Sequence, residues 1–367
     1  MTSETLYQLL LLSSIPGIGH GKLRILVQKF GSPEGVFAAK LHQLKATDGF
    51  DQKTAEKILD PALRDHKFAE EQMKLIEQYN VRVLPFWDLD YPDNLKNIHE
   101  PPAFLFIRGS FSGVDRYAVA IVGTREPTPY GKIMTETLAR ELAIRGITIV
   151  SGLARGIDTI AHQTTLHHGG RTIAVLGSGV DRIYPAENFK LAMDVSLNGV
   201  LISDYPMKTA PDAVNFPGRN RIISGLSLGT LIVEAGEKSG ALITTEYAME
   251  QNRDVFAVPG NVSTLQARGP NQLIKQGAKL VETVDDILAE LESKLIPLKQ
   301  PSQKPLFNLS PTEEAIVGHI LNEPTHVDAI AKQSNISVAE ALTHLLNLEL
   351  MGVVRQMAGK HFIRMHS

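Results

Sequence analysis

The middle of the chain, residues 116–290, alternates short runs of β-branched and aliphatic residues with stretches of amphipathic helix. Runs that are apolar at nearly every position are typical of parallel strands, because helices cover both faces of such a sheet. These runs predict strands at 118–122, 148–151, 172–176, 200–203, 230–233, 255–258 and 279–281. Helices are expected between them, for example at 132–145, 157–167 and 241–251. The alternation predicts an α/β fold with a doubly wound parallel sheet.

The two ends of the chain carry different patterns. The first part alternates helical stretches with loops, and the prolines that follow it indicate extended or turning chain. Near the other end, a polar stretch with several prolines indicates a linker, and the pattern beyond it is typical of a winged helix. We therefore expect a helical domain at 1–85, a sheet domain with its connecting segment at 86–293, a linker at 294–308 and a winged-helix domain at 309–367.

The composition excludes several kinds of chemistry. The 367 residues include no cysteine, which rules out disulfides, Cys-ligated zinc and thiol catalysis and fits a reducing compartment such as the cytoplasm. No basic region precedes the apolar run at 9–12, and no run approaches the ~20 apolar residues of a membrane span. We therefore expect neither a secretory signal nor a membrane partner. The formal net charge is −3, so any field that attracts a nucleic acid must come from a local cluster.

Small residues, hydroxyls and arginines follow three of the predicted strands. Since the carboxyl ends of parallel strands meet at one edge, these residues are expected along one crevice. Glycines let backbone amides approach an anion, and hydroxyls add hydrogen bonds to phosphate oxygens. A glycine after a strand can also be plain turn chemistry, and that alternative stays open. The candidate phosphate-binding residues are Gly123, Thr124 and Arg125, then Ser151, Gly152, Arg155 and Gly156, then Gly177, Ser178 and Gly179.

The segment 216–225 places an aromatic ring, an amide and two arginines within six residues. We interpret it as a loop beside the crevice, where guanidinium groups grip phosphates and Phe216 stacks on an unpaired base. In the alternative interpretation, Phe216 belongs to the core and the arginines pair with carboxylates such as Glu234. The candidate nucleic-acid contacts of this segment are Phe216, Arg219, Asn220, Arg221 and Ser224.

Neither a nucleotide cofactor nor a metal is expected. Gly177 and Gly179 begin like the dinucleotide-binding fingerprint, but the position of its third glycine holds Arg182. Three histidines lie close together in the sequence, yet they lack the helical spacing and the glutamate of a zincin motif.

In order and spacing, the motifs at 123–125, 151–158, 177–188 and 216–224 resemble those of the DNA-processing protein A (DprA, or Smf) family. The motifs at 239–244, 258–260 and 269–274 extend this resemblance over the whole middle region. The resemblance implies an extended Rossmann-like fold that binds single-stranded DNA and forms a homodimer. It also implies loading of the recombinase RecA on incoming DNA during natural transformation.

The resemblance also implies roles for individual residues. The turn ending in Arg125 resembles the family's phosphate-gripping tip, Phe216 its base-stacking residue, and Arg219 and Arg221 its basic lip. The dimer and recombinase contacts of the family correspond to roughly 272–281. On this basis we expect a binding protein with no catalytic residues and no cofactor.

The alternative to a binding protein is a nucleotide-hydrolysing enzyme, similar to the lysine-decarboxylase-like phosphoribohydrolases. Residues 225–234 are the nearest match to the motif of those enzymes, but its Pro-Gly-Gly is missing and Glu234 is one residue late. We expect Glu234 to orient Arg219 or Arg221 instead of acting as a base, and we assign an orienting role to Asp158 as well.

The flanking domains also resemble those of the family. The segment 15–22 is similar to the hairpin of a helix-hairpin-helix (SAM-like) unit, which either holds a DNA phosphate or keeps only the shape of a helical turn. From Phe307 onward, the chain contains four basic residues (Lys and Arg together) and six acidic residues (Asp and Glu together). Because duplex binding requires basic residues, we expect a protein contact or no binding role for the winged-helix domain.

Overall fold

The computed structural model describes residues 1–295, 309–320, 325–350, 353–357 and 359–364. The chain forms two compact units, Met1–Lys299 and Gln300–Ser367. Most of the expected linker, residues 296–308, lies outside the described residues. No helix among the described residues has the length and apolar character needed to cross a bilayer.

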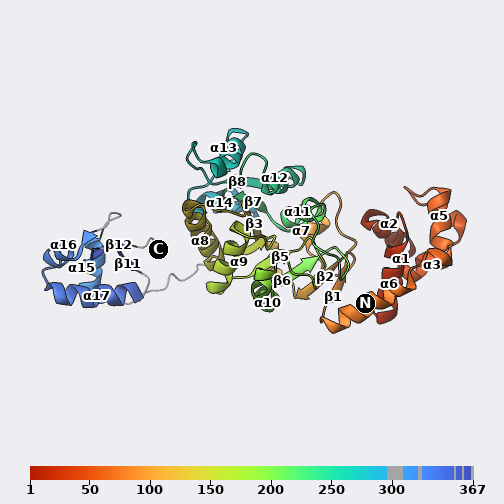
Figure 1. Cartoon of the computed structure of the whole chain (residues 1–367), viewed down its shortest axis with the longest axis horizontal. Helices are drawn as coiled ribbons and strands as arrows, with labels where there is room; N and C mark the ends of the chain where they lie inside the picture. Colours follow the sequence, from red (N-terminus) through yellow and green to blue (C-terminus); the bar gives the residue numbers. More distant parts are fainter. Residues whose placement is uncertain (296–308, 321–324, 351–352, 358, 365–367) are drawn as a thin grey trace. The chain divides into compact units, whose positions relative to one another are not determined.

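The first unit contains a mixed sheet of nine strands in the order β1-β2-β6-β5-β4-β3-β7-β8-β9 (Figure 1). Strands β3 to β9 run parallel, whereas β2 pairs antiparallel with β6 and β1 antiparallel with β2. The strands are β1 (Arg82–Pro85), β2 (Phe104–Gly109), β3 (Ala118–Val122), β4 (Thr148–Ser151), β5 (Thr172–Val175), β6 (Val200–Ser203), β7 (Gly229–Ile232), β8 (Asp254–Ala257) and β9 (Lys279–Leu280).

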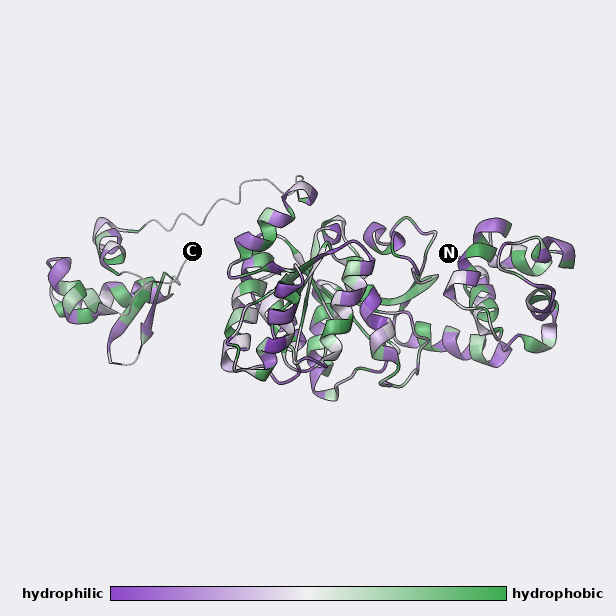
Figure 2. Ribbon diagram, turned by 90° about the horizontal axis from the view of Figure 1, so that it is seen from above, coloured by the Kyte–Doolittle hydropathy of each residue, from purple (hydrophilic) through white to green (hydrophobic). Residues whose placement is uncertain are grey.

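Helices cover both faces of this sheet, as the continuous apolar strands predict. One face packs against α8 (Pro129–Ile144), α9 (Ile157–His167), α10 (Phe189–Asn198) and α14 (Val284–Glu290). The other packs against α7 (Asp93–Lys96), α11 (Asn215–Leu226), α12 (Gly240–Glu250) and α13 (Arg268–Lys275). Along these helices the ribbon in Figure 2 alternates between hydrophobic and hydrophilic residues, as expected of elements with one buried side.

The parallel strands of the structure lie within one residue of the expected ranges at each end. The doubly wound sheet is therefore confirmed. Strands β1 and β2 were not expected: β1 falls in the range given to the helical domain, and β2 falls in the range interpreted as a connecting segment. Short 3-10 helices complete the connections at Pro61–Leu63, Gly113–Arg116, Ala186–Asn188, Leu265–Ala267 and Glu292–Lys294.

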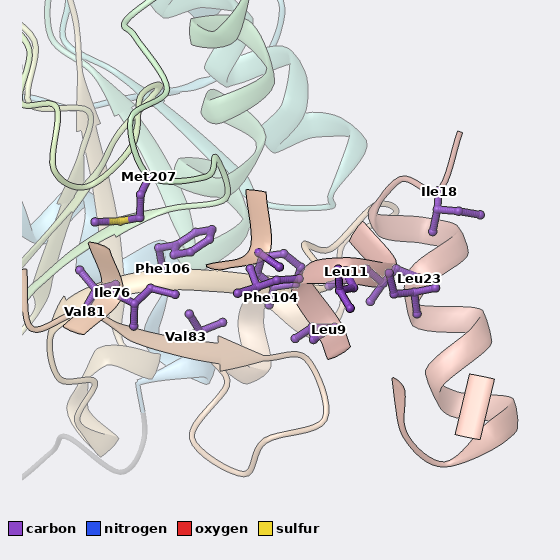
Figure 3. Packing of buried hydrophobic residues seen from close by; sticks show 14 of the residues in the cluster. Leu9, Leu11, Ile18, Leu23, Ile76, Val81, Val83, Phe104, Phe106 and Met207 are labelled. Carbon is purple, nitrogen blue, oxygen red and sulfur yellow. The ribbon is translucent and has the colours of Figure 1, made fainter. Parts of the chain in front are cut away.

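The N-terminal region is helical, as expected. Its helices are α1 (Ser3–Ser14), α2 (His20–Phe30), α3 (Pro33–Ala38), α4 (Leu41–Lys45), α5 (Gln52–Leu59) and α6 (His66–Gln78). Leu9 and Leu11 of α1 belong to one apolar cluster with Phe104 and Phe106 of β2 and with Met207 beyond β6 (Figure 3). The hydrophobic core of the helical region is thus continuous with the antiparallel end of the sheet.

The second unit has its own core, in which Ile316, Ile330 and Phe362 are buried. It consists of α15 (Pro311–His319), β10 (Thr325–His326), α16 (Val327–Gln333), α17 (Val338–Leu350), β11 (Val354–Met357) and β12 (His361–Arg364). The three strands form a sheet in the order β10-β12-β11. Three helices followed by a hairpin confirm the winged helix. The first helix begins with a cap in which Ser310 and Glu313 form a capping box.

Candidate nucleic-acid interface

The order in which the chain adds strands to the sheet reverses between β3 and β7. From β3 the chain adds β4, β5 and β6 on one side, and it then returns to add β7, β8 and β9 on the other. Ligands of doubly wound sheets bind at such a switch point, outside the carboxyl ends of the strands. A pocket of about 490 Å³ opens at this place. Its walls are the turn after β3, one side of α11 and the beginning of α12.

The turn after β3 is held close to its neighbours. A Cβ on Gly123 would lie 2.6 Å from the side chain of Ile157, so only glycine fits there. The Thr124 amide donates to the Glu234 carbonyl at 2.7 Å. Arg125 is exposed and its guanidinium carbon lies 5.7 Å from the centre of the Phe216 ring. The expected Gly123–Arg125 tip therefore lines the pocket, with Arg125 as its exposed charge.

The interpretation of residues 216–225 as a loop is wrong, because they lie in α11. Pro217 is compatible with the helix since it falls in the first turn, where an amide hydrogen has no helical acceptor. With 3.6 residues per turn, positions three, four and seven apart share a side. Phe216, Arg219, Asn220 and Ile223 accordingly line the pocket together.

Phe216 is the centre of a cluster of aromatic and guanidinium groups. The guanidinium carbon of Arg219 lies 5.8 Å from its ring centre, in addition to the Arg125 contact. Tyr184 is 40% exposed, and the centre of its ring lies 6.1 Å from that of Phe216, with 34° between the ring planes. Phe216 itself is only partly buried. It is therefore not a residue of the closed core, and it can present part of its ring to a ligand.

Arg219 is a buried brace and not part of an exposed basic lip. Only 5% of the residue is exposed, and its Nη1 donates to the carbonyls of Gly152, at 2.6 Å, and Val175. It thereby ties α11 to the ends of β4 and β5. Burial lowers the pKa of the Arg219 guanidinium to about 10, and the nearby Asp158 opposes this shift. Arg219 therefore stays charged at neutral pH and contributes positive potential beside the Phe216 ring.

Two further residues of α11 do not reach the pocket. Arg221 points away from it and forms an ion pair with Asp204, with 2.5 Å between Nη2 and Oδ2. Ser224 is fully buried and its hydroxyl donates to the Gln251 side chain at 2.8 Å. Because a helix turns them to other sides, these two residues do not line the pocket, contrary to the expectation that they lie along the crevice. The alternative interpretation, an arginine paired with a carboxylate, holds for Arg221, but the partner is Asp204.

Glu234 does not orient either arginine, so that expectation is wrong. Its carboxylate accepts hydrogen bonds from the Thr128 amide at 2.8 Å and the Thr128 hydroxyl at 2.5 Å. It therefore fixes the beginning of α8. Asp158 does organise the site: its carboxylate accepts from the amides of Gly152 at 3.0 Å and Ala154 at 3.3 Å. Burial raises the pKa of the Asp158 carboxyl, whereas the Arg219 charge opposes this shift.

Two of the expected hydroxyls point inward. The Ser151 hydroxyl donates to the Ile121 carbonyl at 2.6 Å, and the Ser178 hydroxyl donates to the Arg182 carbonyl at 2.6 Å. Both residues are buried, so neither hydroxyl is available to a phosphate in this structure. Gly177 and Gly179 are buried as well, and a Cβ on Gly177 would lie 2.9 Å from the Phe216 ring.

The loop after β4 contributes one exposed cation. Arg155 donates to both carboxylate oxygens of Glu187, at 2.5 and 3.1 Å. This pairing lowers the pKa of the Glu187 carboxyl and raises that of the Arg155 guanidinium. Gly156, with φ of +76°, allows the sharp turn that follows Arg155. A second, smaller pocket joins Arg155 to Arg125, Tyr184 and Phe216.

Several residues of the pocket were not expected as site residues. Among them are Ser239, the N-cap of α12, and Gly240 and Thr244 in its first turns, and the Asn220 side chain donates to the Gly240 carbonyl at 3.2 Å. Because β7 and β3 are neighbours, the segment after β7 was the signal in the sequence that could have revealed them. In the sequence, Tyr184 belonged to the motif at 177–188 but was not singled out as a site residue. Within the described parts of the chain, no group of acidic and histidine side chains could hold a metal ion.

Comparison with known proteins supports the same fold and organisation. A family model described as DNA recombination-mediator protein A matches residues 82–292, more than half of the chain. Models of the DprA winged helix domain and of a SAM-like helix-hairpin-helix tandem match residues 300–360 and 9–64. Protein Smf of Synechocystis sp. is 37% identical over 96% of this chain and 97% of its own length. The DNA processing protein DprA of Bacillus subtilis is 43% identical over 61% of this chain and 76% of its own length.

Two solved structures are also similar. DNA processing protein A from Streptococcus pneumoniae is 31% identical with a TM-score of 0.59, covering 79% of this chain and 98% of that one. DNA processing protein A from Helicobacter pylori, whose structure was described for a single-stranded DNA binding mode, is 32% identical with a TM-score of 0.53 and covers 58% and 96%. The sequence motifs, the nine-stranded sheet and these relatives agree, and the chain belongs to the DNA recombination-mediator protein A family, which includes the DprA and Smf proteins.

Proposed function

We propose that this chain binds single-stranded DNA at the carboxyl ends of its parallel strands. One observation carries the proposal: Phe216 lies in the rim of the switch-point pocket, with the exposed Arg125 on its ring and Tyr184 beside it. An aromatic ring at a pocket can stack on a base only when that base is unpaired. An exposed guanidinium next to it binds the adjoining phosphate. Together these groups favour a single strand over a duplex.

The size and charge of the pocket support this proposal. A volume of about 490 Å³ lies within the ~300–1,000 Å³ of typical ligand pockets. The positive charges of Arg125 and Arg219 lie on the same side of α11 as the ring. The structure of the Helicobacter pylori relative, described for its single-stranded DNA binding mode, supports the same ligand for this chain.

Fluorescence anisotropy with a short labelled oligonucleotide tests the proposal. Because Arg125 is assigned to a phosphate, Arg125→Ala is expected to weaken binding about tenfold and to reduce the slope of log K against log salt by about 0.7. Arg145→Ala is the matched control, since Arg145 follows α8 at the opposite, amino-terminal edge of the sheet. Equal affinity of the Arg125→Ala variant and the native chain would contradict the assignment.

We further infer a homodimer and the loading of RecA on the bound strand, as the resemblance to the family implies. Strand β9 supports an interface in the expected range 272–281: it is the outermost strand next to β8, and Leu280 on it is 39% exposed. Sedimentation of the native chain and of Leu280→Arg tests the dimer. A RecA filament assay on strands coated with single-strand-binding protein tests the loading.

We also infer that the chain acts by binding and not by hydrolysis. The one carboxylate that the enzyme alternative required, that of Glu234, is fixed by two hydrogen bonds from Thr128 and does not line the pocket. Incubation with nucleoside monophosphates is expected to release no free base. Release at a rate proportional to protein concentration, and lost in Glu234→Gln, would support the enzyme instead.

A further inference from the structure

Arg221 is the charged residue of α11 that the proposed DNA site does not use. It follows Arg219 by two positions, which at about 100° per residue places the two side chains on nearly opposite sides of the helix. Its side chain is 16% exposed. Nη2 lies 2.5 Å from Asp204 Oδ2, and Nη1 donates to the Glu100 carbonyl at 2.5 Å. The guanidinium is thus fixed at two nitrogens on the side away from the pocket.

Asp204 is a buried carboxylate that forms an ion pair with α11 through Arg221. Its side chain is 7% exposed, and Oδ1 has no hydrogen-bond partner among the described residues. Arg221 is the one cation that the structure pairs with it by direct contact in the described parts of the chain. A buried carboxylate of this kind depends on its partner, because a lone charge is costly in a protein interior.

The residue after Asp204 holds the same helix at a second point. The Tyr205 hydroxyl donates to the carbonyl of Asn215 at 3.2 Å, in the first turn of α11 and directly before Phe216. The Tyr205 amide in turn donates to the Ser203 hydroxyl at 3.0 Å, at the end of β6. Asp204 and Tyr205 therefore connect the sheet to α11 both at its beginning and at Arg221.

This connecting segment is itself anchored. The buried side chain of Gln72, on α6, accepts from the Met207 amide at 2.8 Å and donates to the Met207 carbonyl at 3.3 Å. Met207 belongs to the apolar cluster that joins the N-terminal helices to the sheet (Figure 3). A helix attached at two points to a segment held in this way is restrained in rotation about its own axis.

We propose that Arg221 and Asp204 are a positioning pair, whose ion pair fixes the rotation of α11 and so holds Phe216 and Arg219 toward the DNA pocket. The inference rests on the proposed single-stranded DNA site, and it assigns to that site two residues that touch no DNA. It predicts a change in DNA affinity of the opposite sign to the usual charge effect. Removing a negative charge near a DNA site normally strengthens binding, because the phosphates are negative. Removing the charge of Asp204 weakens it, since Arg221 is released and α11 with it.

Anisotropy measurements on four variants of the full chain test the pair. Asp204→Asn and Arg221→Gln are each expected to weaken binding about tenfold with an unchanged salt slope, because a misplaced ring loses base stacking while the phosphate contacts stay the same in number. The double variant leaves two neutral amides that can hydrogen-bond to each other, so its affinity is expected to recover to near the native value. Glu246→Gln, which removes an exposed carboxylate from α12, is the charge-matched control and should not weaken binding.

Several results would overturn the positioning pair. Equal or tighter binding by Asp204→Asn would show that its charge acts on DNA only by repulsion. A salt slope reduced by about 0.7 in Arg221→Gln would make Arg221 a phosphate contact. If thermal unfolding shows that either single variant is not folded, the double variant decides the question. DNA binding by the double variant as weak as that of Arg125→Ala contradicts the pair. Failure of the native chain to bind would instead overturn the proposed function itself.

Discussion

Phe216 is the residue on which the contacts of the rim converge. Arg125 lies on its ring from the turn after β3, Arg219 from its own helix, and Tyr184 from the loop after β5. Gly177 lies against the same ring, where a Cβ would be only 2.9 Å away. Three segments distant in sequence, namely the turn after β3, the loop after β5 and α11 itself, thus meet at this ring, which explains why no single motif predicted its surroundings.

Phe216→Ala is expected to reduce affinity for single strands by about 1–3 kcal/mol, the value of one base stacked on an aromatic side chain. Because the ring carries no charge, the salt slope should remain that of the native chain. Anisotropy at several salt concentrations measures both quantities. Phe189→Ala is a suitable control, since Phe189 is 57% exposed and lies at the start of α10. An equal loss in both variants would refute a specific stacking role.

His162 makes a separate prediction about stability and pH. It is fully buried, its Nδ1 lies 2.6 Å from the Thr172 hydroxyl, and burial lowers the pKa of the imidazole to about 3. In the unfolded chain this histidine binds a proton below about pH 6.5, whereas in the folded chain it stays neutral down to about pH 3. The free energy of unfolding is therefore expected to fall by ~1.4 kcal/mol per pH unit as the pH drops through this window.

Urea unfolding between neutral and mildly acidic pH measures this effect as a difference between variants. His162→Gln should be less sensitive to acid than the native chain, because its side chain takes up no proton on unfolding. His168→Gln, at an exposed histidine of the same region, is the control variant. Identical pH profiles for all three proteins would contradict the assignment to His162.

At the scale of elements, the parallel strands were predictable because each is a nearly continuous β-branched and aliphatic run. Strand β2 was missed although Phe104–Gly109 is also largely apolar, because the prolines before it suggested a connecting segment. Helix α11 was missed because Pro217, Gly218 and Asn220 are typical of loops. That single error misplaced Arg221 and Ser224, since only helical geometry separates them from Phe216.

The winged helix gives a prediction for its third helix. The sequence of α17 contains no lysine or arginine, and the exposed residues on it include Glu340 and Leu346. Duplex binding depends on neutralising phosphates, so the full chain should prefer a single strand to a duplex of the same length at every salt concentration. Tighter binding to the duplex, lost on deletion of 300–367, would show that the winged helix reads DNA after all.

At the scale of the whole molecule, all residues assigned to the DNA site belong to the first compact unit. The second unit has a separate core of its own. Deletion of 300–367 should therefore leave the affinity for single strands within about twofold of the native value. Anisotropy and sedimentation of the shortened chain check the affinity and the oligomeric state together. A loss of about tenfold or more would place part of the site in the winged helix.

The location of bound DNA on the molecule tests the central claim most directly. An oligonucleotide carrying a photoreactive thymidine analogue is bound to the native chain, cross-linked by light and mapped by mass spectrometry. A base stacked at the strand-end rim should cross-link to the peptides that contain Phe216 and Tyr184, and an excess of unlabelled single strand should abolish these products. Cross-links confined to α1–α6 or to the second unit, with none on α11, would contradict the claim that the rim of the parallel sheet holds the DNA.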